Sequence, residues 1–351
     1  MELNNIIVSI LTLFIGYLLN KYFLLMSFKY KFNILTDDQF KKPQAFHENP
    51  TPQAGGIVIF LLLSFIFLYL FLYKNIFYSE YISFCTLFFL LGLVDDCKIN
   101  LKPKFRLLIM LVSLVVLVVY NKFYIEKSGL EFLNHLLEID IFSLFFICLC
   151  FLFIINGSNL IDGFNGLLSI HTLIVLIVLS VINFSSKNYD LFYVLFYICF
   201  AILIFLKFNF PKAQMFLGDS GAYLLGAVIA ISTIKTSILN PEISPFFFCI
   251  LLFYLFFEVF FSFFRKLIFV KKSPLFPDNQ HLHMLVYKLF LQNKSKLNSN
   301  YITTIYINLS YFLLLIPGIL FMKNGEFCRY YFFLLSFVYI GFYRLIFKAV
   351  K

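Results

Sequence analysis

Two adjacent carboxylates, Asp95 and Asp96, stand at the end of an apolar run, and several basic residues follow them, including Lys104 and Arg106. Neighbouring carboxylates repel each other unless a cation or a proton lies between them. The pair therefore indicates a site that handles a metal ion or a phosphate. The structural alternative is an acidic end of a membrane span, flanked by lysines whose aliphatic stems lie along the lipid.

Residues 156–166 form a second polar segment, with three asparagines and three glycines inside otherwise apolar sequence. Irregular backbone at membrane depth must line a cavity, because each unpaired N–H or C=O group in lipid costs several kcal/mol. The oxygens of Asn159 and Asp162 are hard donors that suit Mg²⁺ and can bind a sugar or ribose. A simple cytoplasmic turn is the competing interpretation.

Residues 215–221 place Asp219 as a lone carboxylate between glycines. Glycines on both sides allow a bulky phosphate to approach the backbone closely. Asp219 could also cap the helix that is expected to follow, and this structural role is compatible with ligand binding.

Residues 277–284 contain His281 and His283, inside the longest and most basic of the expected interior loops, at about 265–304. His-x-His on a strand would face one way and could bind a transition metal or phosphate oxygens. Two merely solvated histidines are the alternative.

The elements that position these clusters are membrane spans. Of 351 residues, 62% are apolar and 13% are charged, whereas soluble domains average about 45–50% and about 25%. Soluble, disordered and disulfide-rich secreted classes are excluded, and the apolar runs predict an all-α polytopic membrane protein with about 11 transmembrane helices. The expected spans are residues 6–19, 55–73, 81–94, 107–120, 141–155, 167–182, 191–206, 216–234, 246–264, 305–321 and 327–347.

The distribution of basic residues predicts the orientation. With the N-terminus outside, only seven of the 28 lysines and arginines lie outside, and the other 21 lie inside, as the positive-inside rule requires. The C-terminus is then cytoplasmic, and all four polar clusters share the cytoplasmic face. The seven outside residues are Lys74, Lys122, Lys127, Lys187, Lys235, Lys323 and Arg329.

One integral-membrane domain over residues 1–351 is the economical interpretation, because no repeat or low-complexity linker is visible. Its cytoplasmic loop 265–304 carries the His-x-His motif. The first apolar run is expected to be a retained span, since it lacks both a basic n-region and a small-x-small cleavage site.

The ordered series of polar motifs resembles the polyprenyl-phosphate N-acetylhexosamine-1-phosphate transferases, of glycosyltransferase family 4 type. The likeness runs from about His47 to at least His283. It includes His47-Glu48-Asn49-Pro50-Thr51-Pro52 before Gly55-Gly56, then Asp95-Asp96 with Leu101, Lys104 and Arg106, then Asn156, Asn159, Asp162-Gly163 and Gly166-Leu167, then Phe216-Leu217-Gly218-Asp219-Ser220-Gly221, and last His281-Leu282-His283.

The chain departs from the family pattern at several positions. Asn165 stands where the family often has an aspartate, so no catalytic carboxylate is assigned there. Gln53 follows the Pro-Thr-Pro element instead of a basic residue, and Met284 stands where a further histidine is common. Glu258 also resembles a family position, or is a helix-end acid that pairs with Arg265.

The resemblance implies a reaction at the inner leaflet of a bacterial cell membrane. A polyprenyl (undecaprenyl) phosphate attacks the β-phosphorus of a UDP-N-acetylamino sugar, which yields a lipid diphosphosugar and UMP. Both reactants are anionic, so a cofactor Mg²⁺, with Mn²⁺ as a substitute, and the interior basic residues would neutralise charge. The implied partners are the UDP-sugar, the lipid phosphate and the bilayer, with no nucleic acid; a homodimer is left open.

The implied roles follow the motifs. Asp95 and Asp96 are the catalytic candidates, and Asn159 and Asp219 are the metal ligands. In one version Asp95 accepts the last proton of the lipid phosphate, and in the other it attacks first and forms a covalent phosphosugar–enzyme. The substrate-binding candidates are Asn156, Asp162, His281, His283, Lys104 and His47.

The short His-x-His element resembles the branch that starts O-antigen, lipopolysaccharide, capsule or teichoic-acid linkage assembly. The runner-up is the phospho-MurNAc-pentapeptide transferase of peptidoglycan synthesis. A multispan transporter is the competing class, although transporters usually place ionisable groups near the midplane and often show inverted repeats.

Overall fold

The computed structural model describes residues 2–30, 35–37, 50–99, 101–270, 273 and 278–351, and helices dominate it. In lipid a helix satisfies its own backbone hydrogen bonds, which explains why the long apolar runs adopt this form. The α-helices are α1 (Glu2–Tyr30), α2 (Gly55–Lys74), α3 (Ser79–Asp96), α4 (Pro103–Asn121), α5 (Glu131–Leu137), α6 (Asp140–Ile161), α7 (Leu167–Ser185), α8 (Tyr189–Asn209), α9 (Gly218–Leu239), α10 (Pro245–Leu251), α11 (Phe253–Phe264), α12 (Leu282–Leu291), α13 (Lys296–Leu320) and α14 (Gly325–Val350).

The helices confirm the all-α multispan class. Within the described residues, nine helices are long and apolar enough to cross a membrane, and the bent pair formed by α10 and α11, with an angle of 76°, makes up to ten. α3 is not among them, because Glu80, Asp95 and Asp96 reduce its apolar character. It nevertheless packs against α9 inside the bundle.

α9 is the central helix, and it packs against α2, α3, α6 and α7. Small residues allow these helices to approach closely, as in many membrane bundles. A Cβ added at Gly56 would lie 2.3 Å from the backbone nitrogen of Gly221, and one at Gly157 would lie 2.3 Å from the backbone oxygen of Leu255. The outer helices α1, α4 and α14 instead expose large apolar side chains, which suits contact with lipid.

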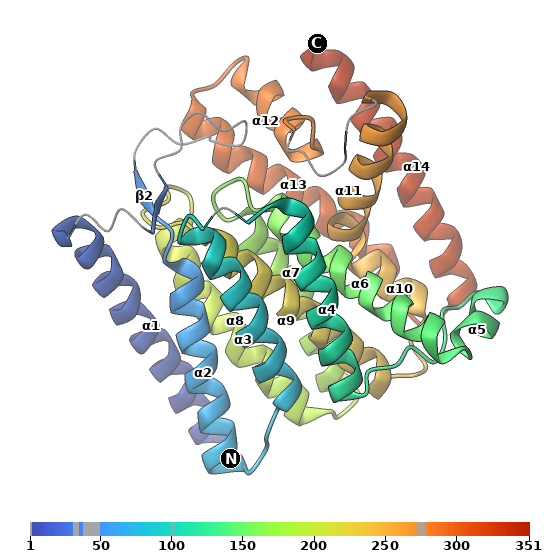
Figure 1. The fold of residues 1–351 in the computed structure, drawn as a ribbon, viewed down its shortest axis with the longest axis horizontal. Coiled ribbons are helices and arrows are strands. Elements are labelled where there is room, and N and C mark those ends of the chain that lie inside the picture. The colour runs from blue at the N-terminus through green and yellow to red at the C-terminus, as the bar shows by residue number, and fades with distance from the viewer. Residues whose placement is uncertain (1, 31–34, 38–49, 100, 271–272, 274–277) are drawn as a thin grey trace.

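Two short strands connect the first span to the bundle. β1 (Thr36–Asp37) pairs antiparallel with β2 (Thr51–Pro52), which lies beside the start of α2 (Figure 1). The segment then hydrogen-bonds to the chain before α9: the N–H of Phe216 donates to the Pro52 oxygen at 2.8 Å, and the N–H of Gly55 donates to the Phe216 oxygen at 3.0 Å. These bonds place the beginnings of α2 and α9 side by side.

The segment 265–304, predicted as a loop, is largely helical where it is described. It contains the π-helical turn η1 (Arg265–Val270), the whole of α12 and the first turns of α13. The strand considered for the two histidines is therefore wrong: His281 is the N-cap residue of α12 and His283 lies in its first turn. In Figure 1, α12 and the C-terminus lie at the upper side of the view, and the N-terminus lies at the lower edge.

The contact of α3 with α9 predicts the effect of Gly92→Ala. A Cβ at residue 92 would lie 2.4 Å from the Asp219 oxygen and from the Ser220 nitrogen, both backbone atoms. Because backbone cannot yield as a flexible side chain does, we expect a loss of about 1–3 kcal/mol, the usual cost of overpacking. Thermal unfolding of the purified protein in detergent measures this as a lower melting temperature.

Gly341→Ala on α14 is the matched control, since no described atom lies within 4 Å of a Cβ at that position. It should leave the melting temperature unchanged. Equal melting temperatures for the two variants would contradict the close packing of α3 on α9.

Candidate active site

The end of α3 caps the beginning of α9. The carboxylate of Asp96 accepts hydrogen bonds from the N–H groups of Asp219, at 2.8 Å, and of Ser220, at 2.9 Å. The first N–H groups of a helix lack intrahelical partners and carry partial positive charge, so an anion is stabilised there. The cap expected from Asp219 itself is therefore supplied by Asp96, and the side chain of Asp219 can serve another purpose.

Glycine is required at the junction between these helices. Gly218 has φ +78°, a conformation that L side chains rarely adopt, and a Cβ there would lie 2.7 Å from Oδ2 of Asp96. The glycine next to Asp219 thus allows the carboxylate of α3 to reach the backbone of α9.

Asp219 also meets the second polar segment. The side-chain amide of Asn159 donates to Oδ1 of Asp219 at 2.7 Å, so the two residues predicted as metal ligands are in direct contact. Asp162 follows the last residue of α6 and lies within electrostatic range of both Asp219 and Asp96. Burial, and then repulsion by these two carboxylates, raises the pKa of Asp162 well above its ordinary value.

Asp95 has a cationic partner that the site prediction did not select. Its Oδ2 accepts a hydrogen bond at 2.8 Å from Nη1 of Arg106, in the second turn of α4. Lys104, which was predicted to bind substrate, is exposed instead. The two neighbouring carboxylates are thus neutralised separately, Asp95 by a guanidinium and Asp96 by a helix N-terminus.

Tyr223 is a further residue that sequence patterns missed. It lies one turn after Asp219 on α9, and its charged neighbours are Asp219, Arg106, Asp95 and Asp96. Its hydroxyl is buried and finds no hydrogen-bond partner within the described ranges. No motif marks it, because a tyrosine in an apolar span is ordinary.

Neutral side chains fix the turn between α6 and α7. The N–H of Asn165 donates to the side-chain oxygen of Asn300 at 2.9 Å, and its own amide donates to the Pro211 oxygen at 2.9 Å. Asn209 accepts from the Gly166 N–H at 2.6 Å and donates to the Met215 oxygen at 2.8 Å. Asn165 therefore has a structural role, consistent with assigning it no catalytic one.

Asn156 lies one turn before Asn159 on α6, and its amide donates to the Leu152 oxygen at 2.8 Å. Residues three apart share a helix face, so Asn156 lies on the same face of α6 as Asn159, and its own hydrogen bond stays within that helix. His47 lies outside the described residues, and its predicted role stays a prediction.

The histidine motif contacts the turn between α6 and α7. Phe164, two residues after Asp162, lies edge-on to the ring of His283, with centroids 5.8 Å apart. Nδ1 of His281 lies 3.0 Å from Oε1 of Glu258. The suggested pairing of Glu258 with Arg265 is wrong, because Arg265 binds Asp278 and Gln280 instead.

No cluster of three His, Cys, Asp or Glu side chains that could hold a metal ion occurs in the described part of the chain. A site built only from protein ligands is thus not seen there. The carboxylate of Asp219 and the amide of Asn159 instead form a small set of oxygen donors, of the kind that Mg²⁺ uses together with waters and substrate phosphates.

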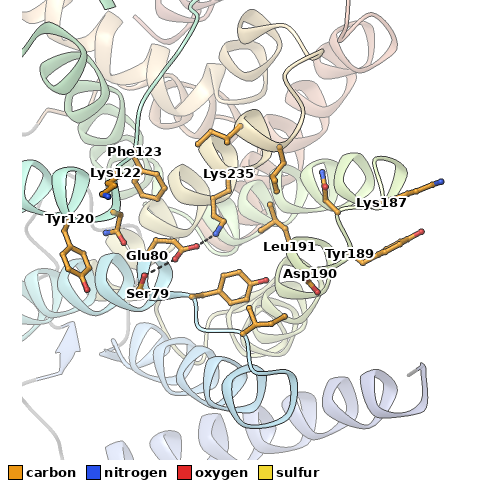
Figure 2. Close-up of a pocket in the computed structure, with 16 residues that line it drawn as sticks. Ser79, Glu80, Tyr120, Lys122, Phe123, Lys187, Tyr189, Asp190, Leu191 and Lys235 are labelled. Carbon is orange, nitrogen blue, oxygen red and sulfur yellow. Dashed lines mark hydrogen bonds and ion pairs between the residues drawn. The ribbon is translucent and has the colours of Figure 1, made fainter. Parts of the chain in front are cut away.

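A cavity of about 930 Å³ lies at the other end of the bundle (Figure 2). Lys235 on α9 points toward Glu80 on α3 there, and the two form an ion pair. Lys235 follows Asp219 by 16 residues on the same helix, which is about 24 Å at 1.5 Å per residue. The cavity is therefore separate from the carboxylate cluster.

Comparison with known proteins identifies the family of the chain. The sequence profile of glycosyl transferase family 4 matches residues 78–237, a region that contains Asp95, Asp96, Asn159 and Asp219. The undecaprenyl-phosphate alpha-N-acetylglucosaminyl 1-phosphate transferase of Thermotoga maritima is 31% identical over 237 residues, which cover 68% of each chain. The chain belongs to glycosyl transferase family 4.

Other relatives match over a shorter region. The phospho-N-acetylmuramoyl-pentapeptide-transferase of Dictyoglomus thermophilum is 36% identical over 195 residues, and that of Streptococcus gordonii is 34% identical over 198 residues. These matches cover 53% and 52% of this chain, and 59% of each relative.

The ion pair at Asp95 predicts the effect of Arg106→Met. The variant leaves a largely buried carboxylate without its cation, a change that typically costs about 2 kcal/mol or more. We expect the rate of sugar-phosphate transfer by membranes carrying the variant to fall by about tenfold or more.

Lys104→Met removes a positive charge from the same end of α4, but from an exposed position. The loss should be several times smaller than for Arg106→Met. Equal losses would mean that the general positive charge of this segment matters, and not the contact with Asp95.

Proposed function

We propose that the protein transfers an N-acetylhexosamine 1-phosphate from a UDP-sugar to undecaprenyl phosphate and releases UMP. The observation that carries this proposal is the meeting of Asp96, Asn159 and Asp219 at the beginning of α9. The transferase of Thermotoga maritima, which is similar over two thirds of the chain, supports the choice of lipid and sugar. The product would start a lipid-linked cell-envelope polysaccharide, such as O-antigen or lipopolysaccharide.

We place the site at the cytoplasmic face of the bacterial inner membrane. The excess of basic residues on one side supports an N-terminus outside and a C-terminus in the cytoplasm. Eleven spans follow if α3 crosses the membrane together with the nine apolar helices and the bent pair.

Mg²⁺ is the proposed cofactor, and the residues present fit it. Asp219 and Asn159 carry hard oxygen donors, and their side chains are already joined by the hydrogen bond from the Asn159 amide N–H to Oδ1 of Asp219. Burial, and then the negative charges of Asp219 and Asp96, raise the pKa of Asp162, and a divalent cation would compensate those charges. When bound, the ion would neutralise the diphosphate and polarise its oxygens.

The chain's own residues prepare the two anions to meet. Arg106 neutralises Asp95 and adds positive charge where the lipid phosphate is expected to approach. Asp95 then accepts the last proton of that phosphate, or attacks the β-phosphorus first and expels UMP, after which the lipid phosphate displaces Asp95 from the covalent phosphosugar–enzyme. Each oxygen of Asp96 accepts one N–H group from the start of α9, so we assign it the task of holding Asp219 in place.

The second candidate is phospho-N-acetylmuramoyl-pentapeptide transfer. The relatives from Dictyoglomus thermophilum and Streptococcus gordonii, at 36% and 34% identity, favour it. Both candidates use the same nucleophile and the same leaving group, and they differ in the sugar that is attached to the UDP.

The decisive test offers membranes carrying the protein undecaprenyl phosphate, Mg²⁺ and a panel of labelled UDP-sugars. We expect label from one UDP-N-acetylamino sugar to enter the organic phase, with an equal amount of UMP released. Asp219→Asn should reduce the signal by about 100-fold or more, because a misplaced or missing contact at the reacting centre costs that much. Label from no donor at all would refute the proposal.

Removal of the metal gives an independent prediction. EDTA should abolish transfer, and added Mg²⁺ or Mn²⁺ should restore it, whereas Ca²⁺ should restore less because it favours longer and less regular coordination. The same titration with Asn159→Ala should need more Mg²⁺ for half-maximal activity. Full activity in EDTA would contradict a role for a divalent cation.

A further inference from the structure

The buried carboxylate of Glu258 collects hydrogen-bond donors from two distant parts of the chain. Glu258 lies on α11 and is 1% exposed, so its charge must be compensated locally. Oε1 accepts from the ring of His281 at 3.0 Å and from the N–H of Leu282 at 3.3 Å. Oε2 accepts from the hydroxyl of Tyr339 on α14.

His281 lies between two carboxylates. Its Nδ1 faces Glu258, and its Nε2 lies 3.3 Å from Oδ1 of Asp278. A neutral imidazole offers one donor and one acceptor, whereas a protonated ring offers two donors. Both ring nitrogens of His281 therefore face a carboxylate oxygen, and neither is left to bind a metal ion or a substrate.

His283 has the opposite arrangement. The rings of His281 and His283 are stacked, with centroids 5.7 Å apart. Nδ1 of His283 meets the hydroxyl of Tyr254 at 3.2 Å, while its Nε2 is buried and has no hydrogen-bond partner among the described residues. Burial lowers the pKa of His283 to about 3, so this ring is neutral.

Two tyrosines of the last helix hold this segment. Tyr339 and Tyr343 are four residues apart and share a face of α14. The hydroxyl of Tyr343 donates to the Gln280 oxygen at 3.0 Å, and Tyr339 packs against the ring of Phe257 with centroids 5.0 Å apart. α14 carries none of the sequence motifs and lies outside the family match at residues 78–237, yet it contacts the histidine motif directly.

We infer that Tyr339, acting through Glu258, is a positioning residue that fixes His281 and thereby places the unpartnered Nε2 of the stacked His283 for contact with the nucleotide sugar. This inference rests on the proposed function. It makes the last span part of the substrate-binding end of the enzyme, with the buried Nε2 of His283 as the ring nitrogen of the pair that has no partner among the described residues.

Tyr339→Phe tests the inference, because it keeps the ring and removes only the hydroxyl. A hydrogen bond to a charged group is lost, and we expect the KM for the UDP-sugar to rise about tenfold with little change in kcat. Tyr331→Phe is the matched control on the same helix, since that hydroxyl donates to the Leu314 oxygen away from the motif. It should leave both constants unchanged.

A double-mutant cycle separates positioning from general destabilisation. If Tyr339 acts through His281, Tyr339→Phe should add nothing to the KM of a His281→Gln protein, because interacting residues give non-additive effects. A full additional tenfold increase would overturn the inference, and so would an unchanged KM in the single variant.

Amide hydrogen exchange of the full-length protein in detergent tests the tether without relying on activity. Tyr339→Phe should speed exchange in α12, where Leu282 loses part of its anchor, and Tyr331→Phe should not. Unchanged exchange would overturn the inference. If the wild-type protein transfers no sugar phosphate, the proposed function fails, and the exchange result alone decides whether Tyr339 holds the motif.

Discussion

The structure depends on one carboxylate at the end of one helix and the unpaired N–H groups at the start of another. Asp96 accepts hydrogen bonds from the backbone N–H groups of Asp219 and Ser220. The carboxylate needs donors, and the N–H groups need an acceptor. An uncompensated carboxylate at this depth would be costly, as would free N–H groups in an apolar bundle. Asp219 is placed by backbone bonds, so its own side chain remains for Asn159 and, under the proposed function, for a divalent cation.

Packing makes that contact possible. Gly92 on α3 and Gly56 on α2 let both helices meet the backbone of α9 at distances that a methyl group would prevent. The hydrogen bonds of Gly55 and Phe216 then align the segment before α2 with the segment before α9. Polar chemistry at one end of the bundle thus depends on glycines whose only contribution is the space they leave.

The sequence was sufficient for features that follow from composition and order. Apolar runs predicted the helical multispan class, and the positions of Asp96, Asn159 and Asp219 at span ends predicted that they could meet. It could not decide between Lys104 and Arg106, because α4 is apolar on most of its surface and its rotation is set by its neighbours. Tyr339 was also invisible, since its partner Glu258 lies 81 residues earlier and only the tertiary fold joins them.

The turn after Asp162 is held by amides and hydroxyls from α8 and α13, and not by ion pairs. Two phosphorylated reactants and a divalent ion would change the local electric field strongly, and ion pairs at this turn would be disturbed by their charges. Hydrogen bonds between neutral groups are much less sensitive to that change. Under the proposed function, the turn between α6 and α7 can therefore keep one conformation while the charge of the bound groups changes during a catalytic cycle.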